Sequence, residues 1–184
     1  MRENFQITDA KTGKTFWIAR NMAVTGLITA TDYTTKETYF LLERRGPGCP
    51  DNIGKLCCVC GYLNWGETRC EALMRETLEE TGIDCKDFDC TIVEWKVIDD
   101  PNRDAKENVV TRYIMSFDLD ELTKALETGK INTDTKSRGG EEGEVDSFFL
   151  MTYESIKDLD PECFAFNHRE MIDEYMEIFN SILK

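Results

Sequence analysis

The chain has 184 residues and a net charge of −14, with 41% hydrophobic and 32% charged side chains. This length suits one domain with a substantial core, and the composition excludes an intrinsically disordered chain. The negative charge argues against a general nucleic-acid binder, because phosphate backbones are bound by clustered Lys and Arg. An acidic protein can still bind small phosphorylated molecules through a bridging divalent cation.

The N-terminal sequence and the cysteines are the features that bear on where the protein resides. No apolar run is long enough to span a bilayer, so no membrane partner is expected. The start, MRENFQITDAKTGK, lacks the apolar core of a secretion signal, so a cytoplasmic location is the default and the eight cysteines are expected to be free thiols. A zinc site built from Cys49, Cys57, Cys58 and Cys60 is the alternative. Packed thiols are favoured, because strand alternation in LCCVCG sends Cys57 to the face opposite Cys58 and Cys60.

Strand and helix patterns alternate along the chain. The expected strands are 16–19, 24–30, 38–43, 56–60, 91–97, 109–117 and 145–151. The expected helices are 69–81, 119–128, 153–158 and 168–183. This mixture predicts a single α/β domain over residues 1–184, an α/β sandwich with a mixed β-sheet.

The helix predicted at 69–81 has clear ends. Thr68 followed by Glu71 forms a capping box, and Gly82 occupies the position of a left-handed C-terminal residue. A buried face is expected on one side of this helix. Its predicted members are Cys70, Met74, Thr77, Leu78 and Thr81.

Three glutamates form a second stripe on the same helix. At about 100° per residue, Glu76, Glu79 and Glu80 fall within roughly 100° of arc. Like charges at this spacing repel, and no lysine alternates with them. The stripe is either a solvated acidic face or a site for Mg2+ or Mn2+, which prefer carboxylate and water oxygens.

The residues around the stripe follow a longer pattern, G-x5-E-x7-R-E-U-x-E-E-x-G-U, where U is a bulky aliphatic residue. Its matching positions are Gly61, Glu67, Arg75, Glu76, Glu79, Glu80, Gly82 and Ile83. This segment resembles the Nudix box, with Thr77 as the departure at the first aliphatic position. A second departure precedes the box, where Val59-Cys60-Gly61 stands in place of the family's frequent Pro-Gly-Gly.

The resemblance extends beyond the box to the strands before it, in ARNMAVTGLIT and YFLLERRG. IDDPNRDAKENVVTRYIMSF and FAFNHREMIDEYM resemble segments of the ADP-ribose pyrophosphatase-like branch, with Asn167 in place of an Asp. The resemblance implies a Nudix-like α/β/α sandwich. It also implies hydrolysis of a nucleoside diphosphate linked to another moiety, for which ADP-ribose is one candidate.

The family resemblance also implies roles for individual residues. Glu76, Glu79 and Glu80 would hold Mg2+ or Mn2+, and Cys60 would offer its backbone carbonyl to the metal. Gly61, Glu67, Arg75 and Gly82 would be structural members of the motif. Glu67 could also assist the metal, and Arg75 is expected to orient a carboxylate through a bidentate pair.

The general base could lie either on the box helix or on a late loop, and the sequence leaves both positions open. Glu141, Glu142 and Glu144 in GGEEGEV are the loop candidates, with Glu142 and Glu144 taken as catalytic; a solvated acidic loop is the alternative. Arg103 is the candidate substrate contact, together with Asp104, although the two could instead stabilise a turn.

His168, the only histidine, is expected to serve the first turn of the last helix, where Asn167 and Glu170 form a second capping box. The expected partner is a small nucleotide, and a homodimer is left open. Two alternatives remain: a nucleoside triphosphate house-cleaning enzyme, and a nucleotide-sensing domain without catalysis.

Overall fold

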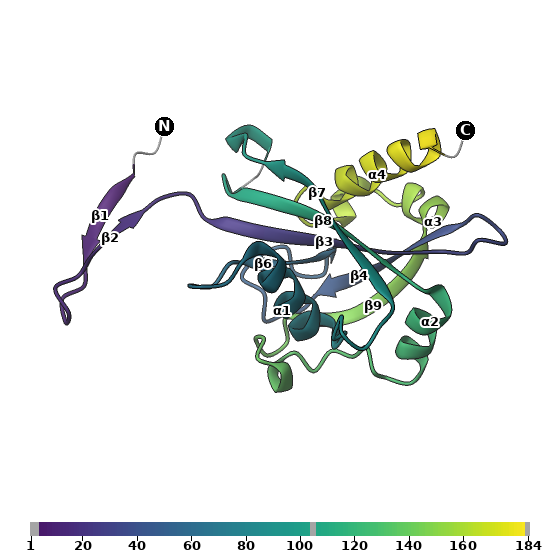
Figure 1. Ribbon diagram of the computed structural model, residues 1–184, viewed down its shortest axis with the longest axis horizontal. Coiled ribbons are helices and arrows are strands. Elements are labelled where there is room, and N and C mark those ends of the chain that lie inside the picture. Colours follow the sequence, from purple (N-terminus) through teal and green to yellow (C-terminus); the bar gives the residue numbers. More distant parts are fainter. Residues whose placement is uncertain (1–3, 104–105, 183–184) are drawn as a thin grey trace.

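A mixed sheet of seven strands forms the centre of the molecule (Figure 1). The computed structural model describes residues 4–103 and 106–182. The strands are β1 Phe5–Thr8, β2 Thr15–Ile18, β3 Met22–Thr31, β4 Thr38–Arg45, β5 Leu56–Cys57, β6 Val59–Tyr62, β7 Cys90–Ile98, β8 Val109–Phe117 and β9 Val145–Thr152. The α-helices are α1 Arg69–Thr81, α2 Leu119–Glu127, α3 Tyr153–Lys157 and α4 His168–Ile182. Short 3-10 turns, η1 Pro101–Arg103, η2 Lys136–Arg138 and η3 Pro161–Cys163, lie between them.

The sheet is mixed because one central pairing is parallel. The main strand order is β5-β4-β3-β8-β7, with β6 pairing to β3 and β9 pairing to β4. Strands β3 and β8 run parallel, from Met22 opposite Val109 to Ala30 opposite Phe117. The other pairings in this sheet are antiparallel. The predicted fold class is therefore confirmed.

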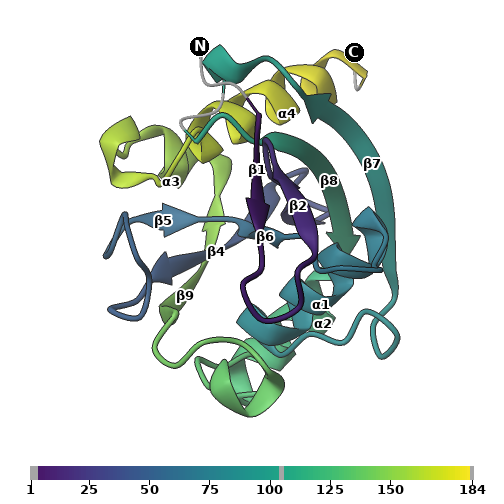
Figure 2. The ribbon, with the colours of Figure 1, turned by 90° about the vertical axis from the view of Figure 1, so that its left-hand side faces the viewer.

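Helices cover both faces of the sheet, with α1 and α2 on one side and α3 and α4 on the other (Figure 2). The alternation of side chains along β4 shows how one strand serves both layers. Leu41 packs into the cluster that contains Leu73 of α1, whereas Leu42 packs into the cluster that contains Met171 of α4. These two cores make the three-layer sandwich.

The predicted strand at 56–60 is wrong as a single element. The chain forms two short strands on different neighbours, since β5 pairs with β4 and β6 pairs with β3. Cys58 lies between them, and its backbone N–H donates to Nδ1 of the buried His168 at 3.0 Å. Because the chain passes from β4 to β3 at this point, Cys60 and Gly61 lie beside the centre of the sheet.

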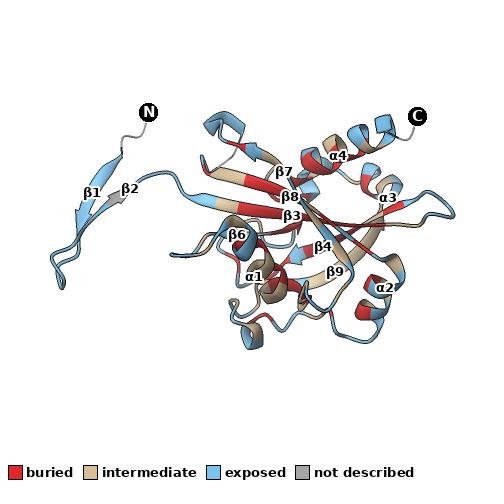
Figure 3. Ribbon diagram, viewed as in Figure 1, coloured by how far each residue is buried: buried red, intermediate tan, exposed pale blue. Residues whose placement is uncertain are grey.

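An N-terminal hairpin of β1 and β2 projects away from this body (Figure 1). A strand was predicted at 16–19, but its partner β1 was not. Phe5 pairs with Ile18 and Ile7 with Phe16, so four apolar side chains share one face. They are 38–56% exposed, and the hairpin stands out as exposed in Figure 3.

Across residues 4–103 and 106–182, none of the helices combines the length and the apolar character that a membrane crossing requires.

Candidate functional site

The helix predicted at 69–81 is α1, with the expected ends. The Glu71 N–H donates to Thr68 Oγ1 at 3.3 Å, and the Thr68 N–H donates to Glu71 Oε2 at 2.7 Å, so the capping box is confirmed. Gly82 adopts a φ of 82°, and its N–H donates to the Leu78 carbonyl at 2.9 Å. Both ends of the acidic helix are therefore fixed by local sequence.

The buried face of α1 differs from the predicted one. Cys70 is exposed, and Met74 and Leu78 are only half-buried. The buried residues are Ala72, Leu73, Thr77, Glu80 and Thr81. Thr77 and Thr81 do face the core, as predicted, and the Thr77 hydroxyl donates to the Leu73 carbonyl at 2.7 Å. One carboxylate of the stripe, Glu80, thus belongs to the inward face.

Arg75 connects the remaining carboxylates of the box. Its Nε and Nη2 donate to the two oxygens of Glu67 at 3.0 and 2.7 Å, which is a bidentate pair with a carboxylate as expected from the sequence. Its Nη1 donates to Glu76 Oε1 at 2.8 Å and to Glu79 Oε2 at 2.9 Å. The hydrogen bonds from Arg75 lower the pKa of Glu67. Arg75 therefore supplies the positive charge that the predicted acidic stripe lacked.

Glu80 lies inside the protein, 1% exposed, and its Oε2 accepts a hydrogen bond from the Cys60 N–H at 3.0 Å. Burial raises the pKa of Glu80 well above the ordinary value, and the nearby Glu43 and Glu76 charges add to the effect. Burial also raises the pKa of Glu76 to about 7, against the opposing effect of Arg75.

Gly61 touches the carboxylate of Glu76. A Cβ added at Gly61 would lie 1.9 Å from Glu76 Oε1 and 2.1 Å from its Cδ, so the carboxylate would have to move. The glycine at the start of the motif therefore makes room for this carboxylate. The Cys60-Gly61 pair thus contacts both Glu80 and Glu76.

Two residues of the late acidic loop, Glu141 and Glu144, lie in this region. Glu144 is half-buried, and its Oε2 accepts a hydrogen bond from the Glu141 N–H at 3.3 Å. Burial raises the pKa of Glu144. Glu142 is exposed and pairs with Lys136 at 2.5 Å. The structure therefore directs Glu144 inward and Glu142 outward.

Close backbone contacts hold this loop against the segment after β4. The Gly46 N–H donates to the Glu144 carbonyl at 2.7 Å, and the Gly48 N–H donates to the Gly143 carbonyl at 2.8 Å. A Cβ at either Gly46 or Gly48 would lie within 2.2 Å of a carbonyl oxygen of the loop. These contacts hold the loop close to the segment after β4.

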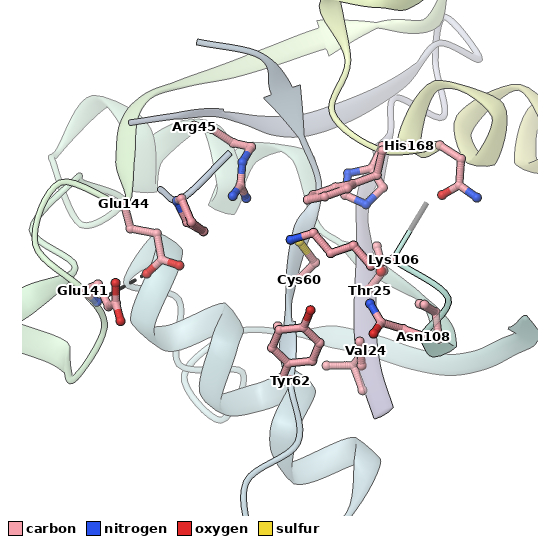
Figure 4. A pocket seen from close by; sticks show the side chains of 16 residues that line it. Val24, Thr25, Arg45, Cys60, Tyr62, Lys106, Asn108, Glu141, Glu144 and His168 are labelled. Carbon is pink, nitrogen blue, oxygen red and sulfur yellow. Dashed lines mark hydrogen bonds between the residues drawn. The ribbon is translucent and has the colours of Figure 1, made fainter. Parts of the chain in front are cut away.

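A pocket of about 280 Å3 opens beside Cys60 and Gly61 (Figure 4). Arg45 and Lys106 approach the ring of Phe166 at 5.2 and 5.3 Å, and both pair with Asp51, at 3.3 and 2.7 Å. The residues lining the pocket are Ala23, Val24, Thr25, Arg45, Pro50, Cys60, Gly61, Tyr62, Lys106, Asn108, Val110, Glu141, Glu144, Phe166, Asn167 and His168. Basic and acidic groups therefore line the same pocket, next to the box carboxylates.

Arg103 lies outside this lining. Its Nη2 pairs with Glu170 at 3.0 Å, and its carbonyl accepts a hydrogen bond from Asn167 Nδ2 at 2.8 Å. Asn167 and Glu170, which were predicted to form a capping box with each other, thus both bond to Arg103 instead. A substrate role for Arg103 stays a prediction, and Asp104 lies outside the described residues.

Glu43 and the basic side of the pocket were not predicted from the sequence. Glu43 is an acidic residue inside the apolar strand YFLLERR, and that position is the signal that could have identified it. Arg45 follows two residues later. Lys106 lies in a turn-rich segment with no pattern of its own, so only the fold brings it to the pocket.

Among residues 4–103 and 106–182, no group of three or more His, Cys, Asp or Glu side chains is arranged so that it could hold a metal ion. Arg75 engages one oxygen each of Glu76 and Glu79. The donor chemistry nevertheless suits a hard cation, since carboxylate and carbonyl oxygens are the ligands that Mg2+ and Mn2+ prefer. A buried, unpaired oxygen on Glu43 adds to that fit.

Comparison with known proteins agrees with this geometry. The family model described as the NUDIX domain matches residues 19–175, which is most of the chain. The chain belongs to the Nudix family. No curated protein sequence matches it.

Solved structures show the same fold at low sequence identity. A MutT/nudix family protein from Enterococcus faecalis is 16% identical with a TM-score of 0.58; the match covers 84% of this chain and 60% of that protein. The NUDIX domain of Shewanella oneidensis NrtR, complexed with ADP ribose, is 13% identical with a TM-score of 0.58, covering 93% of both chains.

A bifunctional NMN adenylyltransferase/ADP ribose pyrophosphatase from Francisella tularensis, complexed with AMP and a Mn ion, is 14% identical with a TM-score of 0.53. That match covers 86% of this chain and 42% of the Francisella protein. These likenesses establish the Nudix fold.

Proposed function

We propose that this chain is a divalent-metal-dependent Nudix hydrolase that cleaves the pyrophosphate bond of a nucleoside diphosphate linked to a second moiety. ADP-ribose is the first substrate to test. The observation that carries the proposal is the placement of the box carboxylates Glu76 and Glu80 directly behind Cys60 and Gly61, at the wall of a pocket with basic residues. The ADP ribose and Mn ion bound to structurally similar proteins support the choice of ligands.

The metal-holding residues in this proposal are Glu76, Glu79 and Glu80, with the backbone carbonyl of Cys60. When bound, the cation neutralises pyrophosphate charge, polarises phosphorus and lowers the pKa of its water. Arg75 acts as a positioning residue, because it fixes oxygens of Glu76 and Glu79 through hydrogen bonds of 2.8 and 2.9 Å.

The pocket supplies the remaining contacts. Arg45 and Lys106 offer positive charge to phosphate oxygens, and Phe166 offers a flat apolar surface. Glu144 is the proposed general base, since it lines the pocket and burial raises its pKa, which makes its carboxylate a stronger base. It would accept the proton of the attacking water on a carboxylate oxygen.

A substrate panel tests the proposal. ADP-ribose, other nucleoside diphosphate derivatives and nucleoside triphosphates are incubated with Mg2+, Mn2+ or EDTA, and the products are separated by chromatography. Hydrolysis of diphosphate derivatives supports the proposal, and selective hydrolysis of triphosphates favours a house-cleaning enzyme. Nucleotide-induced thermal stabilisation without turnover favours a sensing domain instead.

A homodimer and a cytoplasmic location stay predictions. The feature that supports a second copy as partner is the apolar face of the hairpin, exposed through Phe5, Ile7, Phe16 and Ile18. The first 21 residues carry four basic and two acidic side chains, which complements the acidic remainder of the chain. Light scattering should report a dimer for the wild type and a monomer for Ile7→Asp; a wild-type monomer would contradict the prediction.

A further inference from the structure

Glu43 is a buried carboxylate outside the Nudix box. It lies on β4, is 3% exposed, and its Oε2 has no hydrogen-bond partner among the described residues. Its Oε1 accepts a hydrogen bond from the thiol of Cys57, the residue opposite it on β5, at 3.1 Å. A thiol is a weak hydrogen-bond donor, so this contact replaces only a small part of the hydrogen bonding to water that the carboxylate loses on burial.

The side chain of Glu43 points toward the box helix. Alternate residues of a strand share a face, so Glu43 lies on the same side of β4 as Leu41. Leu41 packs in the cluster that contains Ala72 and Leu73 of α1. Glu43, two residues further along β4, faces the same side, and its charge raises the pKa of Glu80 on α1.

The carboxylates that surround Glu43 are short of positive charge. Glu76, Glu80 and Glu144 all interact with it electrostatically. Arg45 lies on the same strand and opposes this repulsion, but its guanidinium donates to the carbonyl and carboxylate of Asp51. Arg75 donates to Glu67, Glu76 and Glu79 but to neither Glu43 nor Glu80.

We propose that Glu43 is a further ligand of the divalent cation, adding a carboxylate from the sheet to those of the Nudix box. This inference rests on the proposed function, because it assigns another residue to the same metal site. The unpaired oxygen of Glu43 is the donor atom for the cation. The cation removes the repulsion between Glu43 and Glu80 and replaces the water that both lost on folding.

An isosteric substitution distinguishes a metal-ligand role of Glu43 from the structural role of a buried, protonated side chain. A protonated glutamic acid and a glutamine have similar shape and polarity, so Glu43→Gln leaves a purely structural role nearly intact. The same change removes a charged metal ligand. Mn2+ affinity of the purified 184-residue chain, measured without substrate by calorimetry and by electron paramagnetic resonance of free Mn2+, distinguishes the two roles.

We expect Glu43→Gln to raise the Kd for Mn2+ by about 10-fold or more. The melting temperature of the metal-free protein should stay the same or rise, because the repulsion between buried carboxylates is relieved. Glu43→Asp, which keeps the charge but shortens the reach, should also weaken binding. Glu154→Gln, an exposed position on α3, is the matched control and should keep the wild-type Kd.

The variants Glu76→Gln and Glu80→Gln separate two kinds of failure. If both weaken Mn2+ binding while Glu43→Gln and Glu43→Asp bind as the wild type does, the assignment of Glu43 is wrong and the box site stands. If neither weakens binding, or the wild type binds no Mn2+, the metal site of the proposed function is itself wrong.

Discussion

Gly61→Ala tests whether the position of the Glu76 carboxylate controls the site. The new Cβ would lie 1.9 Å from Glu76 Oε1, whereas an ordinary contact needs roughly 3.4 Å, so the carboxylate must move by about 1.5 Å. That movement breaks the 2.8 Å hydrogen bond from Arg75. Misplacement of about 1 Å at a catalytic site can cost roughly 100-fold in rate.

We therefore expect Gly61→Ala to lower kcat/KM by about 100-fold and to weaken Mn2+ binding by about 10-fold. Stability should fall by only about 1 kcal/mol, because a partly exposed ion pair contributes little. Gly129→Ala is the control: its φ of 72° makes alanine strained, but nothing lies within 4 Å of the new Cβ. It should lower the melting temperature and leave Mn2+ affinity unchanged. Wild-type rate and Mn2+ affinity in Gly61→Ala would refute the reasoning.

Three further predictions concern the same site. The folded protein raises the pKa of Glu76 to about 7 from 4.5, so folded Glu76 keeps a proton that the unfolded chain loses. The unfolding free energy of the metal-free protein should then fall, by up to roughly 3 kcal/mol, as pH rises from about 4.5 to about 7. Denaturant titrations at each pH measure this free energy, and Glu76→Gln should remove this pH-dependent contribution. Arg75→Lys should lower kcat by about 10-fold because lysine cannot form the bidentate pair with Glu67, and unchanged steady-state kinetics would count against that role. Glu144→Gln should lower kcat by about 100-fold or more and Glu142→Gln by far less, since of these two residues Glu144 lines the pocket and Glu142 does not; equal losses would contradict the assignment of the base.

The ends of α1 were predictable because capping is local. Thr68, Glu71 and Gly82 act within one or two turns of the helix, and the structure has them as predicted. The orientation of that helix was not predictable from its own periodicity. Which face is buried depends on how α1 packs on the sheet, and so Cys70 is exposed while Glu80 is buried.

Strand pairings and contacts between residues distant in sequence could not be predicted in the same way. The LCCVCG segment has one continuous apolar pattern, yet its two halves join different strands because β3 and β4 each offer an edge to pair with. Glu43 and Lys106 approach the box only after the chain folds, from positions far from it in sequence. A motif identifies its own residues but not these partners.

The most direct test of the central claim is product analysis after incubation with ADP-ribose and the rest of the nucleoside diphosphate panel, with and without a divalent cation. We predict release of a nucleoside monophosphate from at least one member with Mg2+ or Mn2+, and no release with EDTA or in Glu80→Gln. No hydrolysis of any member, or hydrolysis that persists in EDTA and in Glu80→Gln, would contradict a metal-dependent hydrolase.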